Sequence, residues 1–230
     1  MTLLGGLPAI LVAMDNEFAA LAAAAEPEGR AKRRGGVRFQ PGRLAGREVL
    51  LVESGLGLTQ AASAATLAVA EFGATGLIST GSAGGMGAEV QVGDVVVGTE
   101  ALYSLADATA FGHYSLGQIP KMPRRFTAVP EAIGLLRGSG GREVHFGLVI
   151  SADSFISAHN YAEVMGRFPD AMATDMETAA IAQVAHSFRV PWVAIRGISD
   201  LCGPGAATDN ETHAHNVTSR SVELICLLFA

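Results

Sequence analysis

Thr174-Asp-Met-Glu-Thr-Ala-Ala-Ile-Ala182 is the stretch that decides the fold. Its pattern is typical of a strand that turns directly into a helix, because small apolar residues begin a helix surface while Asp175 and Glu177 stand at its entrance. A carboxylate at such a junction lies near free backbone N–H groups, at the sheet rim where open α/β folds bind ligands. Taken alone, the two acids are equally well explained as partners of the helix dipole.

The rest of the chain repeats this alternation of apolar strands and helices. The alternation predicts an α/β fold in which a mixed, largely parallel, twisted sheet is flanked by helices in three layers. We expect one domain over residues 1–230, without a linker or a repeat. The predicted strands before the quoted stretch are residues 8–14, 37–40, 48–53, 76–80, 92–103 and 144–150, and 191–198 follows it. The predicted helices begin near residues 18, 57, 130, 159, 176 and 208.

The connections between these elements are also predicted from their residues. Pro41-Gly42 is expected to be a turn between two strands, and Gly81 to Gly85 a glycine-rich loop. The polar segment 104–125 has no clear period and is interpreted as a long active-site or interface loop. The basic run Lys32-Arg-Arg34 is most simply a solvated loop.

Composition excludes several classes of partner. With 49% hydrophobic residues, 28 glycines and a formal net charge of −6, the chain suits a buried sheet and argues against nucleic acid or an anionic membrane. Cys202 and Cys226 have no spacing typical of zinc sites or disulfides, which favours a cytoplasmic location. The apolar stretch ending at Met14 is interpreted as a strand, not a signal peptide, and no apolar run is long enough to cross a membrane.

Four polar side chains follow apolar strands in the same way: Glu17, Ser82, Glu177 and Asp200. Right-handed crossovers are expected to place all four strand ends on one edge of the sheet. Each residue alone suits an ordinary cap or turn, but four together, beside the glycines of residues 81–85, favour a ligand site. The glycine spacing matches neither a Walker A loop nor a dinucleotide fingerprint, so it is only a weak signal.

The chain resembles the 5′-methylthioadenosine/S-adenosylhomocysteine nucleosidases of the purine nucleoside phosphorylase superfamily. The matching motifs occur in family order and extend from about Leu11 to Leu228. They are Ala13-Met-Asp-Asn-Glu17, Ser79-Thr-Gly-Ser-Ala-Gly-Gly85, Val92-Gly-Asp-Val-Val-Val97, Asp107-Ala-Thr-Ala-Phe-Gly112, Ser151-Ala-Asp-Ser-Phe-Ile156, Asp175-Met-Glu-Thr-Ala-Ala-Ile-Ala182 and Arg196-Gly-Ile-Ser-Asp200.

The resemblance implies hydrolysis of an N-glycosidic bond through an oxocarbenium-like transition state. Glu17 would deprotonate the attacking water, helped by Ser82 and Arg196. Asp200 would protonate purine N7, with Ser199 assisting its orientation. For that role Asp200 must hold a proton near neutral pH, so we expect burial or a proton-sharing partner to raise its pKa.

The same resemblance implies the binding residues. The ribose would be held by Glu177 and Met176, and the base by Phe155 stacking and the Ile156 backbone. The remaining substrate contacts would be Met14, Leu56 and Gly84. The family implies a homodimer in which Phe111, His113 and Pro120 complete the 5′-pocket of the other subunit. It implies a nucleoside substrate, with no metal and no organic cofactor.

The comparison with the family also separates the alternatives. Related phosphorylases carry arginines for phosphate where this chain has Asp15-Asn-Glu17 and Ser79-Thr80, so water is the favoured nucleophile. A phosphorylase, a futalosine hydrolase and a non-catalytic nucleoside-binding protein stay as alternatives. Family members often have an aromatic residue about ten positions after the catalytic Asp. Residues 202–210 contain none, which leaves open the choice among 5′-methylthioadenosine, S-adenosylhomocysteine, 5′-deoxyadenosine and aminofutalosine.

Overall fold

The protein is described by a computed structural model that covers residues 5–139, 141 and 143–229. Residues 1–4 and 230, the ends of the predicted domain, and residues 140 and 142 lie outside the described part. The strands are β1 Pro8–Val12, β2 Glu26–Pro27, β3 Lys32–Arg34, β4 Val37–Leu44, β5 Arg47–Glu53, β6 Gly76–Gly85, β7 Val95–Tyr103, β8 Phe126–Thr127, β9 Val144–Ser151, β10 Ala171–Asp175 and β11 Trp192–Asp200. The helices are α1 Asp15–Ala24, α2 Leu58–Ala70, α3 Pro130–Ser139, α4 Tyr161–Arg167, α5 Thr178–Phe188 and α6 Ala206–Phe229, with a 3₁₀ turn at Thr109–Phe111.

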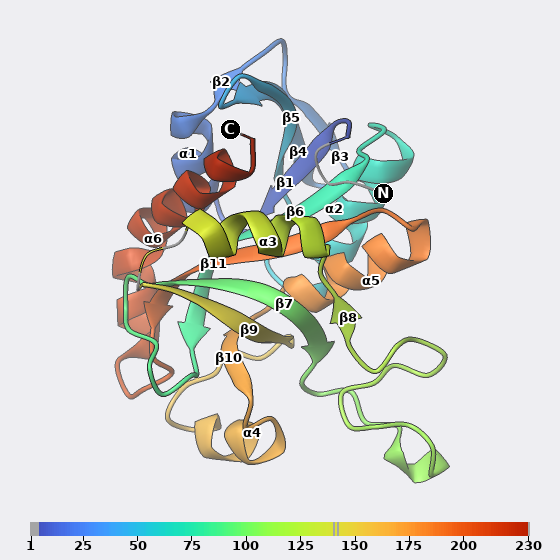
Figure 1. Cartoon of the computed structure of the whole chain (residues 1–230), viewed down its shortest axis with the longest axis vertical. Coiled ribbons are helices and arrows are strands. Elements are labelled where there is room, and N and C mark those ends of the chain that lie inside the picture. Colours follow the sequence, from blue (N-terminus) through green and yellow to red (C-terminus); the bar gives the residue numbers. More distant parts are fainter. Residues whose placement is uncertain (1–4, 140, 142, 230) are drawn as a thin grey trace.

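The sheet is mixed and flanked by helices, which confirms the predicted fold class. Its strand order is β10-β9-β7-β11-β6-β1-β5-β4-β2. β6 lies at its centre and pairs in parallel with β1 and β11, and all ten residues of β6 are buried. In Figure 1, α1 and α6 lie together on one side of these strands, and α2 and α5 pack together on the other. The core is therefore a sheet covered on both faces.

The expectation that all strand ends share one edge is wrong for β10. β7 pairs antiparallel with β11, so β7, β9 and β10 run opposite to β6. β10 also pairs antiparallel with β6, with Thr174 opposite Gly84. This pairing joins the end of the strand order back to its centre, so the sheet curls and closes on itself. Glu177 and Ser82 line the same cavity because β10 runs alongside the last residues of β6.

Two predicted connections are strands instead. β4 runs straight through Pro41 and Gly42, and the turn follows at Ala45 and Gly46, where φ is 48° and 76°. Pro41 is tolerated because its neighbour β2 is a two-residue edge strand, and its carbonyl oxygen accepts from the Glu28 N–H at 2.8 Å. The glycine-rich residues 81–85 are the second half of β6, where they pair with β11.

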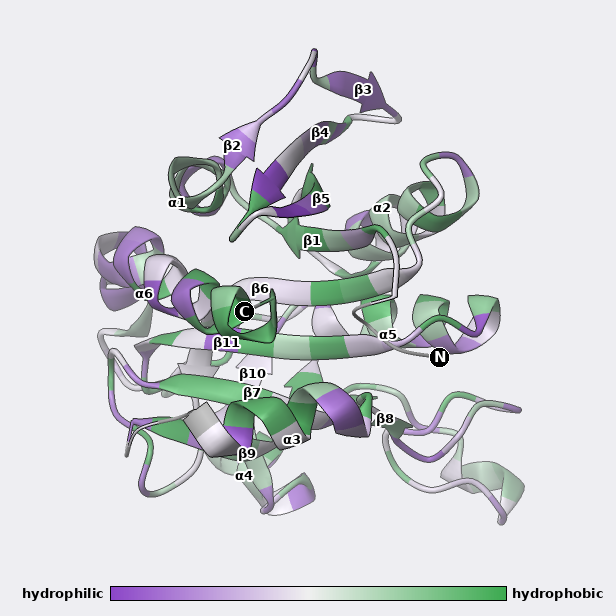
Figure 2. Cartoon of the chain, turned by 45° about the horizontal axis from the view of Figure 1, so that its top comes forward, coloured by the Kyte–Doolittle hydropathy of each residue, from purple (hydrophilic) through white to green (hydrophobic). Residues whose placement is uncertain are grey.

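Two polar segments were both predicted as loops. Lys32-Arg-Arg34 forms the short strand β3, which is exposed and appears hydrophilic in Figure 2, away from the central strands. Segment 104–125 has little regular structure apart from its 3₁₀ turn and extends away from the sheet at the lower right of Figure 1. None of the helices in the described part of the chain has the length and apolarity that a membrane crossing needs.

Candidate active site

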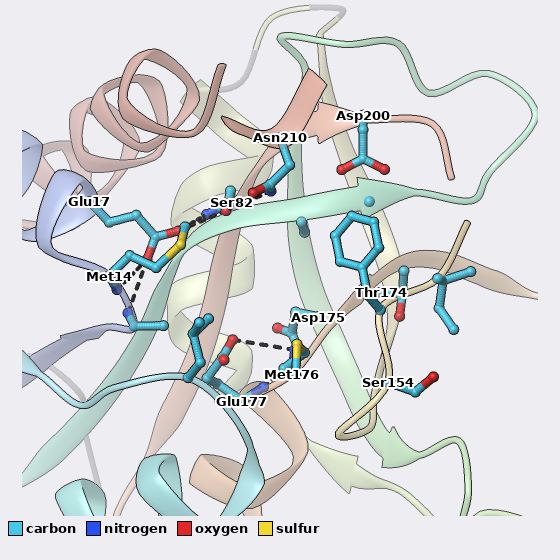
Figure 3. Close-up of a pocket in the computed structure, with 16 residues that line it drawn as sticks. Met14, Glu17, Ser82, Ser154, Thr174, Asp175, Met176, Glu177, Asp200 and Asn210 are labelled. Atoms are coloured by element: carbon cyan, nitrogen blue, oxygen red, sulfur yellow. Dashed lines mark hydrogen bonds between the residues drawn. The ribbon is translucent and has the colours of Figure 1, made fainter. Parts of the chain in front are cut away.

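A cavity of about 520 Å³, including its open mouth, lies where β6, β10 and β11 meet the first turns of α1, α5 and α6. Figure 3 shows Glu17, Glu177 and Asp200 on three sides of it. Most of the residues predicted from the sequence line this cavity: Met14, Glu17, Leu56, Ser82, Gly84, Phe155, Ile156, Met176, Glu177 and Asp200.

Glu17 is held in one orientation by hydrogen bonds to both carboxylate oxygens. Oε2 accepts from the backbone N–H groups of Ala13 and Met14, at 3.0 and 3.1 Å. Oε1 accepts from the backbone N–H and the hydroxyl of Ser82, at 2.8 and 2.7 Å. Gly81, with φ 123°, leaves room for this carboxylate, because a Cβ atom there would lie 2.8 Å from Oε1. Glu17 is therefore a fixed hydrogen-bond acceptor in the cavity wall.

Arg196 and Ser199 lie behind the lining residues. Arg196 is 1% exposed, and its Nε lies 2.9 Å from Asp175 Oδ2 while its Nη2 lies 3.4 Å from Glu177 Oε2. Its Nη1 donates to the backbone oxygen of Ser82 at 3.4 Å. We call Arg196, Asp175 and Glu177 the Arg196 cluster. The guanidinium thus pairs with the two acids of the strand-to-helix junction, so these acids do more than complement a helix dipole.

Glu177 and Asp175 are the members of the Arg196 cluster that line the cavity. Glu177 is also held by the start of a second helix. Its Oε1 accepts from the Gly57 N–H at 3.0 Å, at the start of α2. Burial raises the pKa of Glu177 to about 7, against the opposing effect of Arg196, and the neighbouring charge of Asp175 adds to the rise. Two carboxylates share one cation, so Glu177 keeps lone pairs available to a ligand hydroxyl.

Asp200 lies at the end of β11 and accepts hydrogen bonds from neutral donors. The Ser199 hydroxyl donates to Oδ2 at 2.9 Å, and the Cys202 N–H donates to Oδ1 at 2.9 Å. Burial raises the pKa of Asp200, while these two hydrogen bonds lower it and the charge of Asp209 raises it further. The direction is the one predicted from the sequence, with burial as the largest cause. Such an environment suits a carboxylic acid that donates a proton.

The apolar wall of the cavity comes from the segment after β9. Phe155 is 44% exposed and Ile156 is buried, and both line the cavity. The Asn160 side chain donates to the Phe155 backbone oxygen at 3.1 Å, which holds this turn in place. An aromatic ring that is half exposed at a cavity mouth is available to stack on a planar ligand.

Besides Arg196 and Ser199, three predicted residues are not among those that line the cavity, and several lining residues were not predicted. Phe111, His113 and Pro120 belong to segment 104–125, and Phe111 is 69% exposed. The lining residues absent from the predicted set are Ala13, Ala83, Ser154, Thr174, Asp175 and Asn210. Asn210 follows a Gly/Pro-rich stretch whose path the sequence does not define. Asp175 could have been predicted as a lining residue from its position two residues before Glu177, at the same strand-to-helix junction.

Comparisons with known proteins show the family of the chain. The family model described as the phosphorylase superfamily matches residues 9–230. A 5′-methylthioadenosine/S-adenosylhomocysteine nucleosidase from Anoxybacillus flavithermus is 39% identical over 197 residues, which cover 83% of this chain and 84% of the relative.

Solved structures give the same result. The S. pneumoniae nucleosidase of that name, bound to the transition-state inhibitor MT-ImmA, aligns with a TM-score of 0.92 and 30% identity, covering 97% of this chain and 98% of that one. The Neisseria meningitidis nucleosidase in complex with methylthio-immucillin-A aligns with a TM-score of 0.90 and 36% identity, with coverage of 97% and 98%. The chain belongs to the phosphorylase superfamily and, within it, to the family of the 5′-methylthioadenosine/S-adenosylhomocysteine nucleosidases.

Proposed function

We propose that this enzyme hydrolyses the N-glycosidic bond of 5′-methylthioadenosine and S-adenosylhomocysteine, releasing adenine and the 5′-substituted ribose. The observation that carries the proposal is the arrangement of three buried carboxylates, Glu17, Glu177 and Asp200, in different environments around one cavity. The family membership supports the same substrate class.

Glu17 acts on the nucleophile. It accepts a proton from water, and the hydroxide so formed attacks the anomeric carbon of the ribose. The four N–H and O–H groups that donate to Glu17 keep its carboxylate aimed at one position, which lowers the cost of ordering the water in the transition state. Ser82 also offers its hydroxyl oxygen to that water. Arg196 supports this side indirectly, through the Ser82 backbone oxygen.

Asp200 acts on the leaving group. As the bond from the anomeric carbon to purine N9 breaks, its electron pair moves into the purine ring, and Asp200 gives its proton to N7. Adenine therefore leaves as a neutral molecule. Glu177 accepts hydrogen bonds from the ribose hydroxyls, and its charge stabilises the developing oxocarbenium ion. Phe155 stacks on the base.

Water is favoured over phosphate as the nucleophile. Arg196 is the cation nearest these carboxylates among the described residues, and both Asp175 and Glu177 already pair with it. The carboxylate of Glu17 stands on the nucleophile side and would repel a phosphate dianion. The geometry therefore supports hydrolysis over phosphorolysis.

We further propose that the enzyme is a homodimer in the cytoplasm. Exposed apolar side chains beside the cavity mouth and in segment 104–125, Leu56, Leu105 and Phe111, support an interface there, because large exposed apolar groups mark association surfaces. In the dimer, Phe111, His113 and Pro120 would complete the 5′-pocket of the other subunit. The two free cysteines are consistent with a reducing compartment.

The test is adenine release from 5′-methylthioadenosine, with and without phosphate, with products separated by chromatography. Adenine and free methylthioribose, formed at equal rates under both conditions, would support the proposal. Phosphate dependence with a sugar 1-phosphate product would identify a phosphorylase. No release from this substrate, with release from futalosine, would identify a futalosine hydrolase. No release of a base from any nucleoside would favour the alternative of a non-catalytic nucleoside-binding protein.

A further inference from the structure

Asn210 connects the two halves of the cavity. It lies in the first turns of α6 and lines the cavity between Ser82 and Asp200 (Figure 3). Its side-chain nitrogen donates to the Ser199 hydroxyl oxygen at 2.9 Å and to the Ser82 hydroxyl oxygen at 3.3 Å. One amide group therefore contacts both serines.

These contacts belong to a longer hydrogen-bonded chain. The Ser82 hydroxyl donates to Glu17 Oε1 at 2.7 Å, and the Ser199 hydroxyl donates to Asp200 Oδ2 at 2.9 Å. This series of hydrogen bonds runs from Glu17 through Ser82, Asn210 and Ser199 to Asp200, and every donor in it points away from the Asn210 amide. Each serine oxygen accepts one proton from the amide, and each serine proton is directed to a carboxylate.

We propose that Asn210 is a positioning residue that sets the orientation of both serines and thereby couples the nucleophile side of the site to the leaving-group side. An amide nitrogen has two protons to give, and a hydroxyl has one. A group with two donors at this place holds both serine oxygens and takes up neither serine proton, so both hydroxyl protons stay directed at Glu17 and Asp200. This inference rests on the proposed function.

The same arrangement accommodates both protonation states of Asp200. When Asp200 is ionised, Ser199 donates to it. When Asp200 carries its proton, the Ser199 hydroxyl can turn to the backbone oxygen of Ala83, which lies 3.3 Å from it, and still accept from Asn210. Asn210 thus keeps the Ser199 oxygen in one place in both protonation states of Asp200.

Other charged and titratable groups act on this chain and are unchanged by a substitution at position 210. Arg196 donates to the Ser82 backbone oxygen, and the His213 ring nitrogen Nδ1 lies 3.1 Å from the Ser199 backbone oxygen. The charge of Asp209 and the buried thiol of Cys202 lie near Asp200, and Glu177 lies across the cavity. A change of pH profile in Asn210→Ala, which adds no charge, is therefore attributed to the serines.

The experiment compares Asn210→Ala and the isosteric Asn210→Asp with the wild type, and uses Asn216→Ala, an exposed residue of the same helix, as the matched control. We expect kcat for 5′-methylthioadenosine to fall about 10- to 100-fold in Asn210→Ala, with KM changed less than about threefold. Asn210→Asp should lose more, because it removes both donors and adds a charge beside two carboxylates. Asn216→Ala should match the wild type.

The pH profile of kcat separates positioning from a merely structural role. Without Asn210, the Ser199 hydroxyl donates less to Asp200, so the pKa of Asp200 rises and the alkaline limb moves to higher pH. In a Ser199→Ala background that limb should move no further when Asn210→Ala is added, because both changes act through the same hydroxyl.

Two results in kcat would overturn the inference: wild-type kcat in Asn210→Asp, or a fall in kcat with an unmoved alkaline limb in Asn210→Ala. A loss confined to KM would make Asn210 a substrate contact and would also overturn it. If the wild type itself releases no adenine, the proposed function fails, so the two failures are distinguishable. Thermal melting of each variant identifies a folding defect. If Asn210→Ala is destabilised, kcat of the isosteric Asn210→Asp variant tests the inference in its place.

Discussion

The Arg196 cluster and the surroundings of Asp200 are two solutions to burying a carboxylate in one cavity. In the Arg196 cluster, Asp175 and Glu177 share a guanidinium at 2.9 and 3.4 Å. At the other end, Asp200 accepts from a hydroxyl and a backbone N–H. Arg196 lowers the pKa of Glu177 against the larger effect of burial, whereas Asp200 has no cation partner and accepts only from neutral donors. The contrast assigns binding to one end and proton transfer to the other.

Removing the cation should have the largest effect. Arg196→Met leaves two buried carboxylates without a partner, which should lower the free energy of unfolding by about 3–5 kcal/mol and the melting temperature by roughly 10 °C, and abolish activity. Arg220→Met removes an exposed pair with Glu143 and is the matched control, expected to cost less than about 1 kcal/mol. Equal melting temperatures for the two variants would show that the Arg196 cluster is not structural support.

Neutralising the proton donor should leave the fold intact and remove the chemistry. Asp200→Asn keeps the shape of the side chain, so we expect an unchanged melting temperature and a fall in kcat of about 10²–10⁴. Asp209→Asn, a change of the same kind nearby, should alter kcat less than about threefold. Near-normal turnover in Asp200→Asn would contradict the assignment of Asp200 as the acid.

The pH dependence should differ between the two ends. Asp200 acts in its protonated form, so kcat is full below its raised pKa and is lost as pH rises through it. Glu177 accepts hydrogen bonds in its ionised form, so KM should rise as pH falls below about 7. Steady-state kinetics from pH 5 to 9 checks both signs. A KM that is flat down to pH 5 would count against ribose binding by Glu177.

Loss of the stacking ring should have the smallest effect. Phe155→Ala should raise KM about tenfold, because base–aromatic stacking contributes about 1–3 kcal/mol, while kcat changes less than about threefold. Phe155→Leu retains apolar contact and should lie between Ala and the wild type. A fall in kcat larger than the change in KM would mean that Phe155 orients the base for protonation.

The sequence located most of the site because its residues follow strand ends. Ser82 lies in the second half of β6 and Asp200 at the carboxyl end of β11, and both strands are predicted from the apolar residues in their first halves. Glu17 lies just after β1, in the first turn of α1. Glu177 lines the cavity as expected, but not because its strand ends at the shared edge, since β10 runs opposite to the expected direction.

By itself the sequence determined the longer elements, the α/β class and the chemical types at the site, because apolar periodicity and the junction residues are local. It missed the short strands β2, β3 and β8. Only the tertiary structure decided that β10 closes the sheet against β6, that Arg196 pairs with Asp175 and Glu177, and that Asn210 contacts both serines. These contacts join residues far apart in the chain: 19 positions separate Arg196 from Glu177, and 128 separate Asn210 from Ser82. Strand direction and side-chain partners follow from how the elements pack, and that information is absent from any single stretch.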